Sequence, residues 1–458
     1  MTQSEQNKLI KLNPFTQQIL YDYSRTTLPE LVISIQKLGK SFNDWKLVSI
    51  QERIKYLDLI IINYELLKSE IIYSEALDQG LSLSFTEESN YSVGLQLLNS
   101  FKKELSDQLE NDNTSEKKIY SPQGLTAIFL SWNLSNRLFI QHALPALLAG
   151  NTVLVKCSSS ALSTMKNWKN ILEKSGLASE LIQFVVEDSL QIKNLIVSHP
   201  GVKAICLTGR LDTAVHLIKN SSQISSKIFK KLQIKSGSKN SCLMLDEPNF
   251  LTATKILESA LIGQGQLHWN SSRFFVLDKY QKLWSEIIHD YLEKITPANS
   301  VHDQSVWGPI VKNQSLQQYN QLIATAKNDQ AKFIQGHSSF DSNIYCNPCF
   351  TYDMSNCSEL QQDQLHFPLF ILSVVKYGFD IPKYSNVSYY GDSAYIFGEK
   401  VAAKIFQELE VGTVAKNKWP IYQMEDPLKF STKQSAYGYQ DCRIFGSFNS
   451  NVKYLTKN

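Results

Sequence analysis

The feature that most constrains this fold is a regular alternation of apolar runs and helix-length segments in residues 124–208. The predicted strands are 124–130, 152–156, 182–186 and 204–208, and the predicted helices between them are 137–148, 163–175 and 189–198. Strands that alternate with helices form parallel sheets, and buried parallel strands are continuously apolar because both of their faces are covered. The sequence therefore predicts an α/β fold.

Helical periodicity precedes this region, and a second alternating region follows it. Residues 28–111 are predicted to be mainly helical, and in 50–69 the apolar side chains recur at steps of three and four residues. Further predicted strands are 241–245, 273–276 and 370–375, with helices at 252–262 and 280–294. We expect residues 13–16 to form a turn and the polar segment 109–118 to form an exposed loop or hairpin tip.

Composition and charge exclude several classes of protein. The 458 residues are enough for two or three domains. The net charge of +3 is too small to indicate a nucleic-acid partner or an anionic membrane. The longest apolar stretches are far shorter than the ~20 residues that span a bilayer, and the N-terminal segment lacks the apolar core of a signal peptide. Seven scattered cysteines fit free thiols in a reducing compartment, so we expect a cytoplasmic protein.

Six short motifs occur along the chain in the order typical of one enzyme family. They are Trp132-Asn133 with 145–156 (PALLAGNTVLVK), 199–202 (HPGV) with 207–209 (LTG), Gly265-Gln266 with 273–276 (RFFV), 307–310 (WGPI), 367–369 (FPL) and 412–414 (GTV). Together they resemble the aldehyde dehydrogenase superfamily over residues 13–437, which is nearly the whole chain.

The resemblance implies an aldehyde-dehydrogenase-like fold with three parts. A Rossmann-like cofactor-type domain is expected over 1–105 and 130–232, and a second, catalytic-type α/β domain over 233–428. A small oligomerisation arm would combine 106–129 with 429–458, and residues 444–455 have the character of a strand. In the family such a strand extends a partner's sheet, so we expect a homo-oligomer, a dimer or a tetramer.

The family's chemistry needs a cysteine thiolate that attacks the aldehyde and a glutamate that activates water. The thiolate is suited to this role because it is nucleophilic near neutral pH. An asparagine amide stabilises the oxyanion, and the resemblance places it at Asn133. From its local sequence alone, Asn133 would be interpreted as a turn residue after a strand.

Both remaining catalytic positions have other residues. His268 stands at the cysteine position, and no cysteine occurs in 267–272. The glutamate position falls on Gln233, or on Ile234 if the gap is placed differently, and neither residue can take a proton from water near pH 7. The imidazole of His268 is largely neutral near pH 7 and could act as a base. If it instead attacked the aldehyde as a nucleophile, the resulting adduct would be a poor hydride donor. We therefore interpret His268 as filling the vacated pocket.

The resemblance also implies an NAD or NADP site with altered residues. The matching positions are Trp132, Lys156, Ser159, Gly209, Arg210, Gln364 and His366. Lys156 ends a predicted strand at the edge where ligands bind in open α/β sheets, although a lysine surfacing at a strand end is an equally good interpretation. At these positions the family has other residues. Ser159 replaces an acidic residue, Gln364 replaces a glutamate that binds the ribose, and His366 replaces a phenylalanine. Glu187 and Asp188 bring carboxylates towards the expected pyrophosphate, so we predict weak binding.

The sequence bears on a metal site and leaves two functional hypotheses. Cys346, Cys349, Cys357 and His366 lack the paired spacing of zinc ligands, so no metal is predicted. The first functional hypothesis is a catalytically impaired relative that acts through ligand binding or assembly, with an active paralogue as a further partner. The alternative is an active NAD(P)-dependent oxidoreductase that acts on an aldehyde with altered catalytic groups. Titration with NAD and NADP would separate the two.

Overall fold

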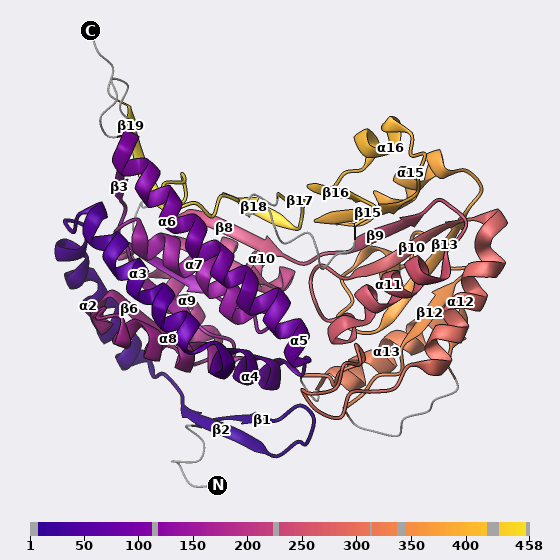
Figure 1. The fold of residues 1–458 in the computed structure, drawn as a ribbon, viewed down its shortest axis with the longest axis horizontal. Helices are drawn as coiled ribbons and strands as arrows, with labels where there is room; N and C mark the ends of the chain where they lie inside the picture. The colour runs from indigo at the N-terminus through magenta and orange to yellow at the C-terminus, as the bar shows by residue number, and fades with distance from the viewer. Residues whose placement is uncertain are drawn as a thin grey trace.

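Two open β-sheets organise the computed structural model, which describes residues 8–111, 118–222, 229–311, 314–336, 344–418 and 430–454. The first sheet has six strands and the second has seven. The sheets lie in separate halves of the molecule, and each half has its own layer of helices (Figure 1). The predicted α/β class is confirmed.

The first sheet is built mainly from the alternating region that dominates the sequence. Its order is β18 (Ala436–Gly438), β8 (Lys231–Ser236), β7 (Val202–Gly209), β4 (Leu125–Phe129), β5 (Thr152–Lys156) and β6 (Ile182–Val185). All neighbouring pairs are parallel except β18 with β8. Every residue of β4 and β5 is buried, as expected for parallel strands with both faces covered.

The helices of this half confirm the predicted helical region. They are α2 (Leu28–Trp45), α3 (Ile50–Leu66), α4 (Lys68–Gln79), α5 (Leu83–Thr86), the π-helix η1 (Glu87–Ser92), α6 (Val93–Asn111), α7 (Ser135–Leu148), α8 (Leu162–Lys174), η2 (Ser179–Leu181), α9 (Leu190–Ser198) and α10 (Leu211–Ser222). The hairpin of β1 (Lys8–Leu12) and β2 (Ile19–Ser24) was not predicted. The connection between its strands contains the predicted turn.

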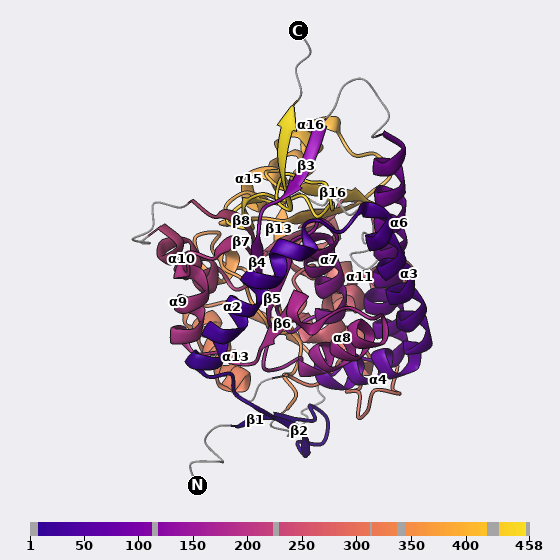
Figure 2. The same cartoon turned by 90° about the vertical axis from the view of Figure 1, so that its left-hand side faces the viewer.

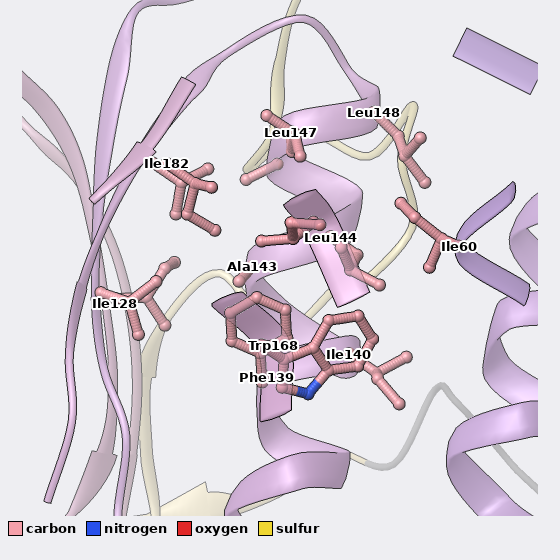
Figure 3. Packing of buried hydrophobic residues seen from close by; sticks show 14 of the residues in the cluster. Ile60, Ile128, Phe139, Ile140, Ala143, Leu144, Leu147, Leu148, Trp168 and Ile182 are labelled. Carbon is pink, nitrogen blue, oxygen red and sulfur yellow. The ribbon is translucent and has the colours of Figure 1, made fainter. Parts of the chain in front are cut away.

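The core of the first half forms around α7 (Figure 3). Phe139 of α7 stacks on Trp168 of α8 with ring centroids 4.4 Å apart, and Ile128 of β4 belongs to the same cluster. The indole N–H of Trp168 donates a hydrogen bond of 2.9 Å to the side-chain oxygen of Asn136. Packing therefore fixes the first turn of α7, directly after the motif that contains Asn133.

The second sheet contains the three further strands that were predicted. Its order is β11 (Lys332–Gln335), β12 (Cys349–Tyr352), β13 (Leu369–Val375), β10 (Ser271–Leu277), β9 (Asn240–Met244), β15 (Ser393–Phe397) and β16 (Thr413–Lys416). Only the β11–β12 pair among these is antiparallel. Its helices are η3 (Ile262–Gly265), α11 (Phe250–Leu261), η4 (Asp278–Tyr280), α12 (Gln281–Lys294), α13 (Gln314–Asn328), α14 (Glu359–Gln362), η5 (Gly378–Asp380), α15 (Ile381–Ser385) and α16 (Ala403–Glu408).

A two-stranded ribbon projects from the first half (Figures 1 and 2). It pairs β3 (Lys118–Pro122) with β19 (Ser450–Tyr454) in antiparallel register. The ribbon accounts for only part of the two segments expected to form the arm. The segment 106–129 also contains the end of α6 and all of β4, a central strand of the first sheet, and the boundary after 232 divides β8. Residues 112–117 of the predicted loop and 455–458 of the tail lie outside the described residues.

The chain enters the first half again before it reaches the ribbon. The short pair β14 (Tyr390–Gly391) and β17 (Thr432–Lys433) precedes β18, which extends the first sheet beside β8. Ile444 and Phe448 then pack into the core around α7 and are 0% and 1% exposed. Residues 436–449 are therefore part of the first half and not of a detached arm.

Two buried carboxylates on α4 connect the N-terminal helices to the first turn of α7. The Glu75 carboxylate accepts hydrogen bonds from the Thr164 hydroxyl, from Gln79 Nε2 at 2.7 Å and from Asn90 Nδ2 at 3.2 Å. Asp78 accepts from the Ser163 backbone N–H at 2.8 Å. Burial raises the pKa of Glu75 to about 7, because desolvation outweighs these donors, and it also raises the pKa of Asp78.

We expect this cluster to make the protein less stable at higher pH. A pKa raised in the folded state means that the folded chain holds its proton when the unfolded chain has released it. Stability from Glu75 is thus fully present below about pH 4.5 and lost as pH rises through about 7, a change on the order of 3 kcal/mol. Urea unfolding between about pH 5 and pH 8 measures this slope.

The matched variant is Glu75→Gln, which cannot ionise. Its unfolding free energy should fall less over the same pH range, with the residual fall due to Asp78. Thr164→Val provides a second test, because it removes a donor to the carboxylate and should displace the transition to higher pH. An unchanged slope in both variants would contradict the assignment.

Candidate active site

A cavity of about 230 Å³ lies between the two halves of the protein and is lined by residues from both. The predicted site residues that line it are Trp132, Asn133, Gly209, Arg210, His268, Gln364 and His366. The loop after β4 and the ends of β7 and β8 form the wall from the first half. Segments after η3 and before β13 form the opposite wall. This is the carboxyl edge of the first sheet, where ligands bind in open α/β folds.

Asn133 is held in the loop between β4 and α7. Its side-chain oxygen accepts a hydrogen bond of 2.7 Å from the Ser131 hydroxyl, which leaves the amide N–H group as the end available to a ligand oxygen. The next residue, Leu134, has a left-handed backbone with φ of 48°, and its N–H donates to Gln79 Oε1 at 2.7 Å. Gln79 in turn donates to Glu75. The buried α4 cluster therefore positions the loop of Asn133.

His268 is half-buried and lines the cavity from the second half. Its backbone carbonyl accepts hydrogen bonds from the Ser238 hydroxyl and from Asn240 Nδ2, the latter at 3.1 Å. Its ring meets the Trp269 ring edge to face at 4.8 Å. An imidazole thus stands on the cavity wall at the position that was predicted for it.

Gln233, the position predicted for the general base, does not line the cavity. Its side-chain amide donates to the backbone oxygen of Asp441 at 3.1 Å and to the Cys442 sulfur at 3.7 Å. Lys235 follows two residues later on the same face of β8, nearer the carboxyl end of the strand, and it does line the cavity.

None of the seven cysteines lines this cavity, and all seven lie in described residues. Cys442 contacts a residue of its wall, because the cavity residue Gln141 donates to the Cys442 sulfur at 3.4 Å. That sulfur is 3.9 Å from Nδ1 of His142. Burial raises the pKa of Cys442 and lowers the pKa of His142 to about 3. The pair is therefore a protonated thiol beside a neutral imidazole, which is not a reactive thiolate.

The charged residues that line the cavity are mainly cationic. Arg137, Arg210 and Lys235 face it, against Asp392 as the one carboxylate among the described lining residues. Asp392 accepts a hydrogen bond of 2.7 Å from the Ser431 hydroxyl. Burial, with Arg210 as the next cause, lowers the pKa of His366 to about 4, so this ring is neutral at pH 7. The cavity therefore favours an anionic ligand.

The expected ribose and pyrophosphate end of the dinucleotide site has a different character. Lys156 forms an ion pair with Asp188, and Arg25 forms one with Glu187 at 3.3 Å. Neither Lys156 nor Ser159, which lies in a turn after β5, lines the cavity. The structure therefore separates these two residues from the other predicted cofactor positions.

Gly237, which lines the cavity, has no room for a side chain. A side chain there would collide with the Tyr390 ring and approach Gln364 Oε1 to 2.9 Å. At the end of the site expected for the pyrophosphate, Lys156 is thus paired with one carboxylate and a second carboxylate is paired with Arg25.

Two further features of the described residues concern metal binding and membrane spanning. Among these residues, no group of three or more His, Cys, Asp or Glu side chains is arranged to hold a metal ion. Cys346 and Cys349 belong to a hydrophobic cluster of the second half. No helix among the described residues is long and apolar enough to cross a membrane.

The family model for the aldehyde dehydrogenase family matches residues 1–455. A putative aldehyde dehydrogenase of Staphylococcus aureus (strain USA300) is 21% identical over 432 residues, covering 91% of this chain and 89% of the relative. Solved structures are similar in fold at lower identity. An Escherichia coli NADP-dependent enzyme has a TM-score of 0.87 at 18% identity, covering 98% of this chain and 94% of that one.

An indole-3-acetaldehyde dehydrogenase in complex with NAD⁺ has a TM-score of 0.88 at 17% identity, covering 99% of this chain and 94% of that one. At such identities these structures establish the fold and do not establish the activity. The match of the family model over nearly the whole length is the stronger finding. The chain belongs to the aldehyde dehydrogenase family.

Proposed function

We propose that this protein is catalytically impaired in aldehyde oxidation and acts by binding a ligand in the cavity or by assembly. The observation that carries the proposal is the composition of the cavity wall. His268 and Lys235 line it, no cysteine does, and Asp392, its only described carboxylate, is hydrogen-bonded to Ser431. Neither an imidazole nor an ammonium group can form the thioester from which the family's product is hydrolysed.

The binding half of the proposal is supported by what the cavity keeps. Asn133 lines the cavity with its side-chain oxygen bonded to Ser131, and the cations Arg137, Arg210 and Lys235 line the same space. An amide donor and several cations can hold a carbonyl oxygen and an anionic group without any covalent step. We therefore assign a small, anionic carbonyl compound as the ligand class.

An active NAD(P)-dependent oxidoreductase with altered groups is the second candidate. It is supported by relatives of the same fold, one an NADP-dependent enzyme and another in complex with NAD⁺. In this chain Trp132, Asn133 and Gly209 remain on the cavity wall. The pairing of Lys156 with Asp188 argues against tight cofactor binding and places this candidate second.

The test is a turnover assay of the full chain with NAD and with NADP across short, long and aromatic aldehydes. We expect no reduced cofactor above the background of the buffer. His268→Ala is the matched control and should be indistinguishable from the native protein. Turnover that disappears in His268→Ala while the fold persists would contradict the proposal and favour the second candidate.

We also propose that the protein forms a homodimer in the cytoplasm. The β3–β19 ribbon projects from the first half, and its outer edge can add to the sheet of a second copy. Main-chain hydrogen bonds supply the affinity of such strand addition, so it tolerates changes in side chains. The free cysteines fit a reducing compartment. Assembly with an active paralogue would use the same ribbon.

A further inference from the structure

Lys235 is a primary amine on the wall of the candidate site. It lies one residue before the end of β8, in register with Thr208 of β7, and both residues line the cavity. The side chain is half-buried. Burial, with the charge of Lys235 as the next cause, lowers the pKa of His142 on α7.

The other lysines near this region do not line the cavity. Lys156 is in an ion pair with Asp188, and Lys231 of the same strand donates to the backbone oxygens of Ser447 at 2.8 Å and Ser450 at 2.7 Å. Lys239 is buried and does not line the cavity. Among the described lining residues, Lys235 is the one lysine.

We propose that Lys235 captures an aldehyde as a covalent imine, an inference that rests on the proposed function because it requires an aldehyde to enter the cavity. Amines of lysine side chains form Schiff bases with carbonyl compounds in this way. The reaction gives the protein a covalent, reversible chemistry that needs neither a thiol nor a dinucleotide.

The bonds and protons of this step balance without an oxidant. The Lys235 nitrogen, once deprotonated, forms a bond to the aldehyde carbon, and the carbonyl oxygen becomes the hydroxyl of a carbinolamine. The C–O bond then breaks, the nitrogen loses its remaining proton, and one water molecule leaves. The Asn133 amide can hold the oxygen while its charge develops, and His268 can deliver a proton to the departing hydroxyl.

The cavity also specifies the class of aldehyde. Arg137 of α7 and Arg210, which directly follows β7, line the same cavity as the lysine. A guanidinium binds a carboxylate with two parallel hydrogen bonds. A small aldehyde that carries a carboxylate at its far end therefore fits better than a neutral aldehyde of equal length.

Borohydride trapping tests the proposal. The full-length protein is incubated with succinic semialdehyde or with butanal, reduced with sodium cyanoborohydride, and analysed by intact mass and peptide mapping. We expect one dominant adduct on Lys235, formed more completely with succinic semialdehyde. Lys235→Arg keeps the positive charge and should reduce labelling to the level of surface lysines. Lys231→Arg, on the same strand, should label like the native protein.

The outcomes separate this proposal from the proposed function. Adducts spread evenly over surface lysines, or dominant labelling that persists in Lys235→Arg, would overturn the imine. Thermal unfolding of Lys235→Arg verifies that the variant is folded, and Lys235→Met provides a second nucleophile-free variant. Cofactor reduction is measured on the same samples. Turnover with NAD or NADP refutes the impaired function even if an adduct forms, whereas no adduct and no turnover refutes the imine alone.

Discussion

A chain truncated after Gly438 should fail to fold in its first half. The deletion removes Ile444 and Phe448, which are 0% and 1% exposed in the core around α7. Loss of a buried phenylalanine side chain alone costs about 3–5 kcal/mol, and whole proteins are stable by only about 5–15 kcal/mol. The deletion also leaves polar groups unpaired. The Glu104 carboxylate loses the N–H groups of Ile444 and Phe445, and Asn151 Nδ2 loses the Asn449 carbonyl.

Truncation after Ser450 is the matched control, since it removes most of β19 and keeps the buried segment. This shorter deletion should keep a cooperative unfolding transition and weaken the proposed dimer. Calorimetry and light scattering at micromolar concentration distinguish the two effects. A first half that still unfolds cooperatively after the longer deletion would contradict the buried role of residues 439–449. A native protein that is monomeric, and unchanged by the shorter deletion, would contradict the dimer.

Most strands predicted from sequence are largely or wholly buried. The strands β4, β5, β7, β9, β10 and β13 are apolar, and their sequences were sufficient to locate them. The strand β8 was missed because its sequence, KLQIKS, alternates polar residues that contact the C-terminal segment or face the cavity. The β1–β2 hairpin was missed for a related reason, since most of its residues are exposed or half-buried.

The candidate site was predictable where motif order determined it. Asn133 and His268 both line the cavity, as the resemblance implied. Lys235 was missed because the predicted gap moved the base position to Gln233. The two residues share a face of β8, and only their position along the strand relative to the cavity distinguishes them. The contact of Cys442 with Gln141 joins residues 301 positions apart. No local pattern in the sequence indicates such a contact.

The orientation of Asn133 depends on contacts of the same long-range kind. Gln79 fixes the backbone of Leu134, and Glu75 fixes Gln79, although α4 and the Asn133 loop are 55 residues apart. A motif can identify Asn133 from the sequence. The residues that hold its loop belong to α4, and nothing in the sequence of α4 marks it as the support of a site. This is the physical reason why the residues of the site were easier to predict than their supports.

Binding of dinucleotides should be weak in the native protein and should tighten in the double variant Glu187→Gln, Asp188→Asn. Both substitutions keep the shape of the side chain and remove its charge. In the native protein, Asp188 neutralises Lys156 and Glu187 neutralises Arg25. The double variant leaves both cations to interact with the phosphates of the ligand, and charge-assisted hydrogen bonds to phosphate are among the stronger interactions in proteins.

We expect the dissociation constant for NAD or NADP to fall by about tenfold or more in this variant, equivalent to about 1.4 kcal/mol. Isothermal titration calorimetry measures it, and the gain should shrink at high ionic strength because part of the new interaction is exposed to solvent. Adding Lys156→Ala to the double variant should reverse most of the gain in affinity. This control distinguishes an attraction by the freed lysine from a mere loss of repulsion between the carboxylates and the phosphates. A low-micromolar dissociation constant for the native protein would show that the Lys156–Asp188 pair opens readily, and would make the oxidoreductase hypothesis the leading one.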